Sequence, residues 1–252
     1  SSRRKKKGRP KSWAAPIAKP AAKKAPGNVE VKTDATGAQL CKAGKCTKLE
    51  LPAPASTSEG NEAETWNVVV SDDGKRAAAT NGGTKNLYLL DGATGKQLKH
   101  VALGEQHGEC IEGPNFLGES IYVISNVCAG PGGHGELHSW DGTRLGEIQE
   151  INVYGTHPVR IAGERWAFTD SGGGHVVIVD VKTAKTIHSI AVNRPDDCSD
   201  CDAIGDSVYW SIHPLVKTPS GKLVTISHGI SLLDPATGKV EKTWKPTACP
   251  EK

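Results

Sequence analysis

The chain of 252 residues carries 31 Lys and Arg against 28 Asp and Glu, and 37% of its residues are hydrophobic, which fits one domain with a sizeable core. It has no apolar run near the length of about 18 residues that a membrane-spanning helix needs, so such a helix is excluded. Its 29 Gly and 15 Pro, scattered between short apolar runs, are typical of an all-β protein with many turns, and the absence of Met indicates that Ser1 is not a translation start.

Residues 1–27 differ in composition from the rest of the chain. They contain ten basic residues and no acidic one, which leaves 21 basic and 28 acidic residues, a net charge of −7, for residues 28–252. An Ala/Pro-rich basic segment cannot bury enough apolar surface to fold, so we expect a disordered tail at 1–27 and a folded domain at 28–252. The residues expected to bind a polyanion are Arg3, Arg4, Lys5, Lys6, Lys7, Arg9 and Lys11.

Within the tail, Lys7-Gly8-Arg9-Pro10-Lys11 resembles the core of an AT-hook. The resemblance implies an extended segment in the minor groove of A·T-rich DNA. The alternative is attachment to an anionic lipid surface, downstream of a removed signal peptide or a lipid-bearing residue.

Residues 28–52 form a partial repeat of the unit that follows. Aligning Gly44-Lys45 with Gly95-Lys96 places Cys41 at the end of one strand and Cys46 at the start of the next. Two cysteines that flank a tight hairpin turn are well placed to form a disulfide. Residues 53–64 are expected to be a loop.

The clearest unit spans residues 70–104 and predicts three short strands at RAAATN, NLYLLD and KQLKHVAL. Asp72-Asp73-Gly74 opens it, Gly82-Gly83 joins the first two strands, and a turn from Asp91 to Lys96 joins the last two. The pattern returns at residues 165–192, with Asp180 in the place of Asp91, and again where Asp234 to Gly238 repeats the turn.

Residues 109–153 give a longer version of the unit. Cys110 and Cys128 are centred on its turn at Leu117 to Ser120, so they are expected to lie opposite each other and form a second disulfide. Further units are expected at 156–194 and 198–246, the last with an added segment, PLVKTPSGKLVTISHG, after its second strand.

The second strands recur at regular intervals. Thr80, Ser125, Thr169 and Ser211 are spaced by 45, 44 and 42 residues. A period in the forties with four short strands per unit predicts a β-propeller of about five four-stranded blades.

The segments TNGGTKNLYLLDGATGKQL, YVISN and TDSGGGHVVIVDVKTAKTI resemble the bacterial YVTN-type repeats, which are related in shape to quinoprotein and WD-type propellers. The resemblance covers about residues 28–246 and implies the architecture rather than an activity. The first unit lacks a clear outermost or innermost strand, which leaves closure of the ring open.

Six of the nine histidines fall in the connections expected on one side of the propeller, where binding residues tend to lie. They are His107, His134, His157, His175, His213 and His228. One hypothesis is a divalent metal or ligand site formed by these side chains, and no other cofactor is expected. The other is that they are separate, solvated residues, since no HxH or HxxxH pair is present. His100, His138 and His188 fall in strands and are expected to be structural.

Cys198 and Cys201 form a CxxC segment without the strand-to-helix context of a redox motif. As zinc ligands they would need Cys249 and His213 as well. The favoured interpretation is one disulfide drawn from Cys198, Cys201 and Cys249, with Cys198–Cys201 as the pair. Three disulfides indicate an oxidising compartment such as the periplasm, the cell surface or the medium, and a cytoplasmic or nucleoid location is the alternative.

Catalytic signatures are weak, with no GxSxG elbow, phosphate-binding glycine loop or CxxCH motif. Acidic residues expected in loops that could bind Ca²⁺ or act as acid and base are Glu109, Asp196, Asp197 and Asp202. Trp140, Trp166 and Trp210 are expected in the core between blades.

Three functions are therefore considered. The favoured one is an exported, non-enzymatic propeller that binds a protein partner through its loop-rich face, with the basic tail as tether. The alternatives are a propeller metal protein or hydrolase or lyase that uses the loop histidines, and a DNA-associated protein that uses the AT-hook-like tail.

Overall fold

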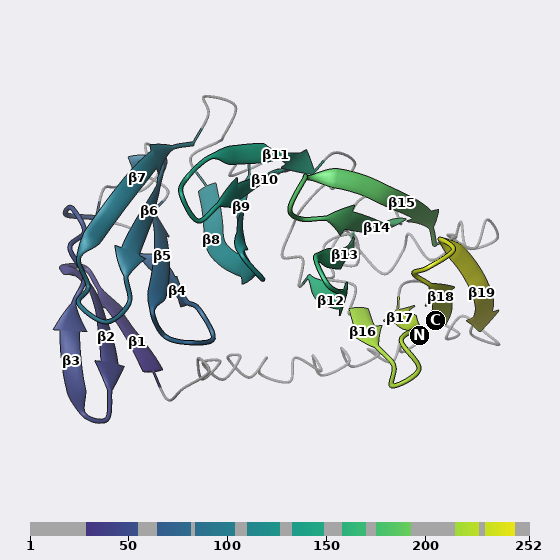
Figure 1. Cartoon of the computed structure of the whole chain (residues 1–252), viewed down its shortest axis with the longest axis horizontal. Helices are drawn as coiled ribbons and strands as arrows, with labels where there is room; N and C mark the ends of the chain where they lie inside the picture. The colour runs from purple at the N-terminus through teal and green to yellow at the C-terminus, as the bar shows by residue number, and fades with distance from the viewer. Residues whose placement is uncertain are drawn as a thin grey trace, which may run out of the picture.

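The computed structural model describes residues 29–54, 65–81, 84–103, 110–126, 133–148, 158–169, 175–192, 215–226 and 230–244. These residues form five antiparallel sheets, which stack side by side along an arc from β1–β3 to β16–β19 (Figure 1). The described segments include no helix that could cross a membrane. The expected all-β propeller class is confirmed, whereas the tail at 1–27 lies outside the described residues.

The first sheet has three strands and the second has four. The first consists of β1 (Val29–Asp34), β2 (Gly37–Lys42) and β3 (Lys45–Lys48). The second consists of β4 (Asn67–Val70), β5 (Arg76–Asn81), β6 (Asn86–Asp91) and β7 (Gln97–Ala102). The first sheet thus departs from the expected four strands within the described residues.

The other three sheets each have four strands taken consecutively from the chain. The third contains β8 (Cys110–Leu117), β9 (Ser120–Asn126), β10 (Gly133–Ser139) and β11 (Arg144–Ile148). The fourth contains β12 (Val159–Ala162), β13 (Arg165–Thr169), β14 (His175–Asp180) and β15 (Lys185–Ala191). The fifth contains β16 (Leu215–Lys217), β17 (Leu223–Ile226), β18 (Ile230–Asp234) and β19 (Lys239–Trp244).

The core lies between the sheets, because alternate side chains of each central strand point to opposite faces. We call the face of a sheet that looks toward the next sheet along the chain its front face, and the opposite face its rear face. In β6, Leu87 and Leu89 on the front face pack with Ile121 and Val123 of the third sheet. Tyr88 on the rear face packs against the first sheet. The central strands are therefore almost wholly apolar, as expected for strands covered on both faces.

The same two-sided packing continues along the arc. Phe168 and Val177, on the rear face of the fourth sheet, pack with Tyr122 of the third. Ile178, on the front face, packs with Leu223 of the fifth. Each sheet thus buries its central strands against its neighbours, which is the radial packing that the period of the sequence predicts.

Short turns close the four-stranded sheets along one side of the arc, which we call the turn side. Asp91 Oδ1 accepts hydrogen bonds from the backbone amides of Ala93 and Thr94, at 2.9 and 2.7 Å. Asp180 makes the same contacts with Lys182 and Thr183, at 3.0 and 3.2 Å. By accepting hydrogen bonds from the backbone amides, these carboxylates fix the shape of each tight turn. The sequence predicts this for Asp91, Asp180 and Asp234.

The last sheet corrects one expectation. The segment from Pro214 to Gly229, expected as an insertion, supplies its two inner strands, β16 and β17. Leu215 and Leu223 pack against the fourth sheet, and Thr218 accepts a hydrogen bond from the Lys222 amide at 3.0 Å in the turn between them. The expected second-strand residue Ser211 lies outside the described residues. Burial of Leu215 and Leu223 explains why this segment, despite its Pro and Gly, belongs to the sheet.

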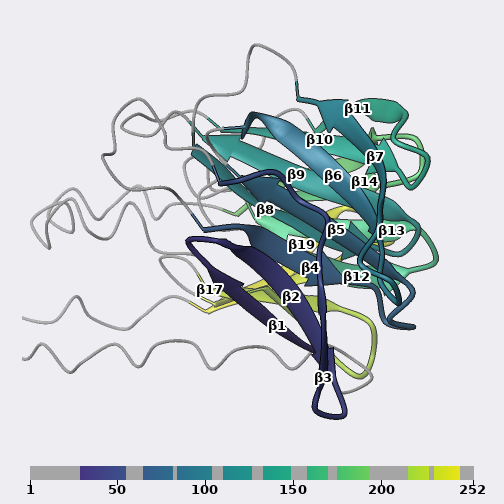
Figure 2. The ribbon, with the colours of Figure 1, turned by 90° about the vertical axis from the view of Figure 1, so that its left-hand side faces the viewer.

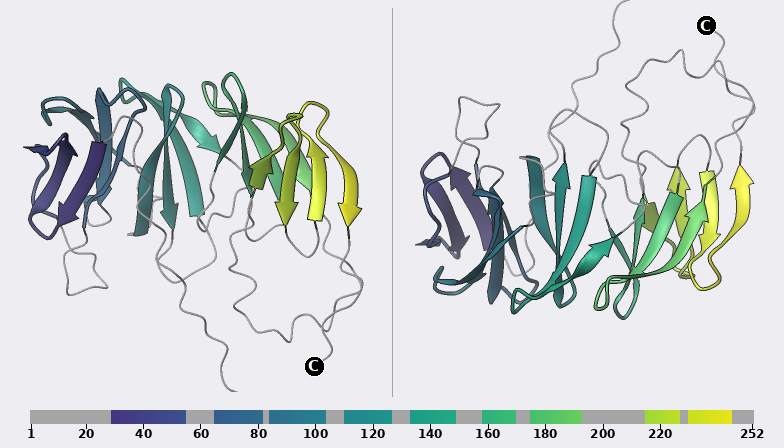
Figure 3. Two further views of the ribbon diagram at one scale, coloured as in Figure 1. Left: turned by 90° about the horizontal axis from the view of Figure 1, so that it is seen from below. Right: turned by 90° about the horizontal axis from the view of Figure 1, so that it is seen from above.

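The first sheet, β1–β3, and the last, β16–β19, lie at opposite ends of the arc (Figure 3). On the rear face of the first sheet, the pairing of β1 with β2 and of β2 with β3 places Glu30, Cys41 and Cys46 in one row. Gln39, Lys32 and Lys48 form the neighbouring row. This polar surface suits contact with water, as in the end units of repeat proteins.

Candidate functional site

Among the four-stranded sheets, every connection of more than five residues lies on the side opposite the turn side. We call it the loop side; Figure 2 views the arc from the end formed by β1–β3. The loop side holds the connections between second and third strands and those between successive sheets. Every connection of the turn side in these sheets has five residues or fewer. The longest connections of the four-stranded sheets are thus all on one side.

Of the six histidines considered as ligands, the structure places two. His134 lies near the start of β10, paired with Ser125, and His175 is the first residue of β14, paired with Ala191. Both lie within the first two residues of a third strand, at the loop side of neighbouring sheets. His107, His157, His213 and His228 lie outside the described residues. Within the described part of the chain, no three His, Cys, Asp or Glu residues are grouped as metal ligands.

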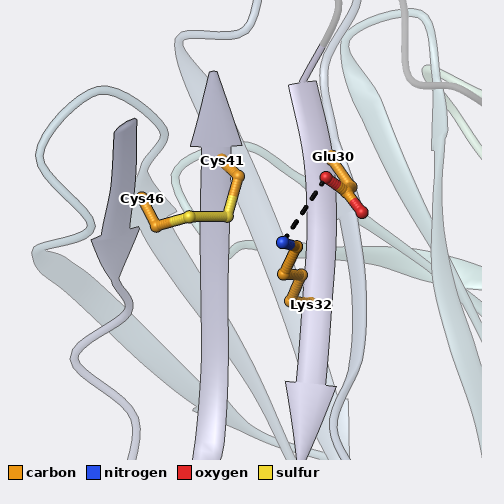
Figure 4. The surroundings of a disulfide bond; sticks show 4 residues. All are labelled: Glu30, Lys32, Cys41 and Cys46. Carbon is orange, nitrogen blue, oxygen red and sulfur yellow. Dashed lines mark ion pairs between the residues drawn. A yellow bond between two sulfur atoms is a disulfide. The ribbon is translucent and has the colours of Figure 1, made fainter. Parts of the chain in front are cut away.

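The disulfide between Cys41 and Cys46 is confirmed (Figure 4). Its sulfur atoms are 2.08 Å apart and it joins directly paired residues of β2 and β3. The second expected pair is only half described: β8 pairs Cys110 with Asn126, and Cys128 lies outside the described residues, two positions further on. A bulge between Glu112 and Pro114 shifts this register from the symmetric one.

The remaining cysteine and tail predictions concern residues that the structure does not describe. These are Cys198, Cys201 and Cys249, the acidic residues Glu109, Asp196, Asp197 and Asp202, and the basic tail residues. They stay predictions.

Polar side chains are buried near the loop side, at the ends of the sheet interfaces. Thr80 at the end of β5 and Thr169 at the end of β13 stand at matching positions, and both are buried. Thr225 and Ser231 are buried where the fifth sheet meets the fourth. The Thr80 hydroxyl has no hydrogen-bond partner among the described atoms. The apolar layers thus end in polar groups on the side where the loops emerge.

A buried charged cluster in the third sheet was not anticipated. Glu136 and His138 are two residues apart on β10, so both point to its rear face, and they are only 3% and 1% exposed. His138 Nε2 lies 3.1 Å from Glu136 Oε2, and Arg144 Nε donates to Glu136 Oε1 at 2.6 Å. The cluster joins β10 to β11. The alternation of polar residues in ELHS was its only signal in the sequence.

The strand histidines and the tryptophans mostly behave as expected. His188 Nε2 lies 3.3 Å from the Ala236 carbonyl of the fifth sheet, and His138 is buried. Trp140 packs at the interface of the second and third sheets, and Trp166 at that of the third and fourth. His100 is on β7, and Trp210 lies outside the described residues.

Comparisons with known proteins support the architecture. The structure is similar to a computationally designed protein, Ika8, with a TM-score of 0.56 and 13% identity, covering 86% of this chain and 58% of that one. It is also similar to the C-terminal WD40 domain of Sif2, with a TM-score of 0.55 and 12% identity over 86% of this chain and 57% of that one.

A third similar structure is the dihydro-heme d1 dehydrogenase NirN in complex with DHE. Its TM-score is 0.51, with 17% identity over 83% of this chain and 43% of that one. No family model and no curated protein matches the sequence. At these identities the likeness shows the β-propeller fold alone, and the chain spans about half the length of the structures that it resembles.

Proposed function

We propose that this chain is a non-enzymatic binding or scaffold protein that holds a protein partner on its loop side. The observation that supports this most is the division of its connections between two sides. The turn side is closed by short turns that carboxylates hold in place, so its shape varies little. The loop side carries all the long connections of the four-stranded sheets on a rigid stack, and loops carried on a rigid scaffold are where binding tends to occur.

We further propose that the protein works outside the cytoplasm. The Cys41–Cys46 disulfide supports this, because disulfides persist in oxidising compartments. The basic tail, with Arg3, Arg4, Lys5, Lys6, Lys7, Arg9 and Lys11, would tether the domain to an anionic lipid surface. Removal of residues 1–11 should then abolish binding to vesicles that contain anionic lipid. Preferential binding of A·T-rich DNA by the intact chain would favour the DNA-associated function instead.

Photocrosslinking in the cells that make the protein tests the binding side. Benzoylphenylalanine placed at Gly83 or Gly172, in second-to-third strand connections, should form adducts with a partner. The same amino acid at Thr94 or Lys182, in turns of the same two sheets, is the matched control and should form none. Adducts from the turn positions alone would contradict the proposal. Deleting residues 216–227 is not a suitable test, because it removes the buried Leu223 and the fifth sheet with it.

A further inference from the structure

The Cys41–Cys46 disulfide lies on a sheet face that no described sheet covers. The first sheet packs through its front face on the second, and it stands at the end of the arc (Figure 3). The pairing of β2 with β3 places both cysteines on the rear face. Cys46 is exposed, whereas Cys41 is only 5% exposed. A dissolved thiol can therefore reach the disulfide, and it can do so on the side of Cys46.

Cys46 also lies on the free edge of the sheet. In the order β1-β2-β3, β3 is an edge strand, and no described strand pairs with its other side. The Leu49 amide donates to the Ala38 carbonyl at 2.9 Å, and hydrogen-bonded pairs alternate with non-hydrogen-bonded pairs along antiparallel strands. Cys41 and Cys46 therefore form a non-hydrogen-bonded pair, in which the backbone N–H and C=O of Cys46 point away from β2. These groups face a molecule that approaches from the free edge.

The position of the bond relative to the strands selects one sulfur as the target. A thiolate attacks a disulfide sulfur from the side opposite the sulfur that leaves. Glu30, Cys41 and Cys46 lie side by side across the three strands (Figure 4). Attack on Cys41 would have to come from the side of Glu30 on β1, whose carboxylate repels a thiolate. Attack on Cys46 comes from the free edge of β3, so Cys46 is the residue attacked and Cys41 the one that leaves.

Charges on the same face favour an anionic attacker. The row of Lys32, Gln39 and Lys48 lies next to the row that contains the disulfide. Lys32 lies 3.7 Å from Glu30 and offsets its charge. Lys48 comes two positions after Cys46, so both side chains point to the rear face. The two rows together carry two Lys and one Glu, and a thiolate therefore meets a net positive charge there.

The first sheet packs through the face opposite the disulfide. Val29, Leu40 and Leu49 are buried on its front face together with Trp66. The disulfide joins residues five positions apart, and closing so short a loop adds little to stability. When the bond opens, strand pairing keeps the two thiols side by side. The bond can then close again, as a cycle of exchange requires.

We propose that Cys41–Cys46 is a thiol–disulfide exchange site. The thiolate of an incoming thiol attacks Cys46 Sγ, the Cys41–Cys46 bond breaks, and Cys41 leaves as a thiolate that takes up a proton. A second thiolate then attacks the incoming sulfur of the mixed disulfide and releases Cys46 as a thiolate. In sum, two thiols are oxidised to one disulfide, and the protein is reduced by two electrons. Attack of the Cys41 thiolate on Cys46 Sγ of the mixed disulfide restores the bond instead.

The reacting group of the partner is a thiolate, which a low-molecular-mass thiol or a protein cysteine supplies. The exchange does not depend on binding at the loop side. It agrees with the proposed location, because an exchangeable disulfide stays closed only in oxidising surroundings.

Reduction of the native chain tests the exchange. The purified full-length protein is incubated with reduced glutathione, the reaction is stopped by acid and alkylation, and the peptides are mapped by mass. A glutathione adduct should appear at Cys46 and be followed by free thiols at Cys41 and Cys46, while the far-ultraviolet circular dichroism stays unchanged. Reduction of this bond only at denaturant concentrations that unfold the chain would overturn the proposal.

Two matched variants test which sulfur is attacked. Cys41→Ser and Cys46→Ser both lose the disulfide, and each leaves one of the two thiols. With oxidised glutathione, Cys46 in the first variant should form the mixed disulfide about tenfold or more faster than Cys41 in the second, because only Cys46 is exposed at the free edge. Equal rates, or a faster reaction at Cys41, would also overturn the proposal.

The Cys41→Ser variant distinguishes the two sources of the thiol. Without Cys41, the mixed disulfide at Cys46 cannot be resolved within the chain, so it should accumulate in the cells that make the protein. A small increase in intact mass identifies a low-molecular-mass thiol, and a reducible band of higher mass on a gel identifies a protein thiol. An unmodified Cys46 thiol in those cells would contradict the exchange.

Discussion

Arg76 of the second sheet reaches Glu119 of the third, with Nη1 2.6 Å from Oε2. The same guanidinium lies 5.8 Å from the ring centre of Phe116 and 5.5 Å from that of Trp140. Arg76 thus joins two blades through its charge and through its contact with aromatic rings of the next blade.

We predict that these two contributions can be separated. Glu119→Gln should lower the free energy of unfolding by less than about 1 kcal/mol, because Glu119 is largely exposed and such pairs are weak. Arg76→Ala should cost more, about 1–2 kcal/mol, because it also removes the stacking on Phe116 and Trp140. Urea denaturation of both variants measures this. Equal losses would show that the aromatic contacts add nothing.

The turn carboxylates predict a loss of stability in acid. The Ser139 hydroxyl and the Thr143 amide lower the pKa of Asp141 to about 2, and the Ala236 amide and the Lys222 ammonium do the same for the pKa of Asp234. Because these values lie below 3.8, the stabilisation is complete above that pH and is lost as the pH falls toward 2. The melting temperature should therefore vary little from these groups between pH 7 and about 5 and drop below pH 4.

The double variant Asp141→Asn, Asp234→Asn tests this assignment. It should flatten the acid limb of the melting temperature against pH. Asp72→Asn is the control, since Asp72 accepts none of the turn hydrogen bonds described for Asp73. An unchanged acid limb in the double variant would assign the effect to other carboxylates.

The buried cluster of β10 predicts unequal effects of its members. Arg144→Ala should cost about 3–5 kcal/mol, because it leaves the Glu136 carboxylate, which is only 3% exposed, without its guanidinium partner. Glu136→Ala should cost less, since the charge that it leaves behind is on Arg144, whose side chain is about half exposed. Chemical denaturation measures both, with Glu147→Ala at the partly exposed end of the cluster as control. A loss from Arg144→Ala no larger than that from Glu147→Ala would contradict the cluster's structural role.

The disulfide should stabilise the first sheet modestly. Cys41 and Cys46 are separated by five positions, and closing so short a loop contributes about 2 kcal/mol in the chain-entropy model. Cys41→Ser with Cys46→Ser should therefore lower stability by about that amount. In denaturation experiments, a reductant should lower the free energy of unfolding of the double variant less than that of the native chain. Intact mass before and after reduction, with counting of thiols by alkylation, would show whether Cys110 and Cys198 are bonded as predicted.

Most of the fold prediction from sequence depends on the residues that favour turns. Asp91, Asp180 and Asp234 mark the turns between third and fourth strands, because an Asp followed by small residues favours a tight turn. Its carboxylate accepts hydrogen bonds from the backbone amides of that turn. Glycines with positive φ, such as Gly118 and Gly163, mark turns between first and second strands. The spacing of these turns then gives the period and the class of fold.

The sequence pattern alone does not show which segment supplies the inner strands of the last sheet or which charged residues are buried. Packing between the sheets determines both. The sequence predicts the second strand of the last unit at Ser211, with residues 214–229 as an insertion after it. Contact of Leu215 and Leu223 with the fourth sheet assigns the two inner strands to residues 215–226. Glu136 and Arg144 were missed because they are charged residues in short strands, which usually lie in water. The burial of Glu136 follows from its place on the rear face of β10, which looks toward the second sheet, and sequence alone does not give that position.

Each four-stranded sheet is built from strands that follow one another directly in the chain. Nearly all pairing is therefore local in sequence, which favours fast folding and allows each unit to form once its own residues are available. A chain that emerges N-terminus first can complete the strand pairing of the first sheet before the second is made. That sheet then offers Val29 and Leu40 as a ready apolar surface for Trp66 and Ala77 of the next. Because the sheets stack in the order in which they are synthesised, each new sheet can pack on the exposed apolar face of the sheet before it.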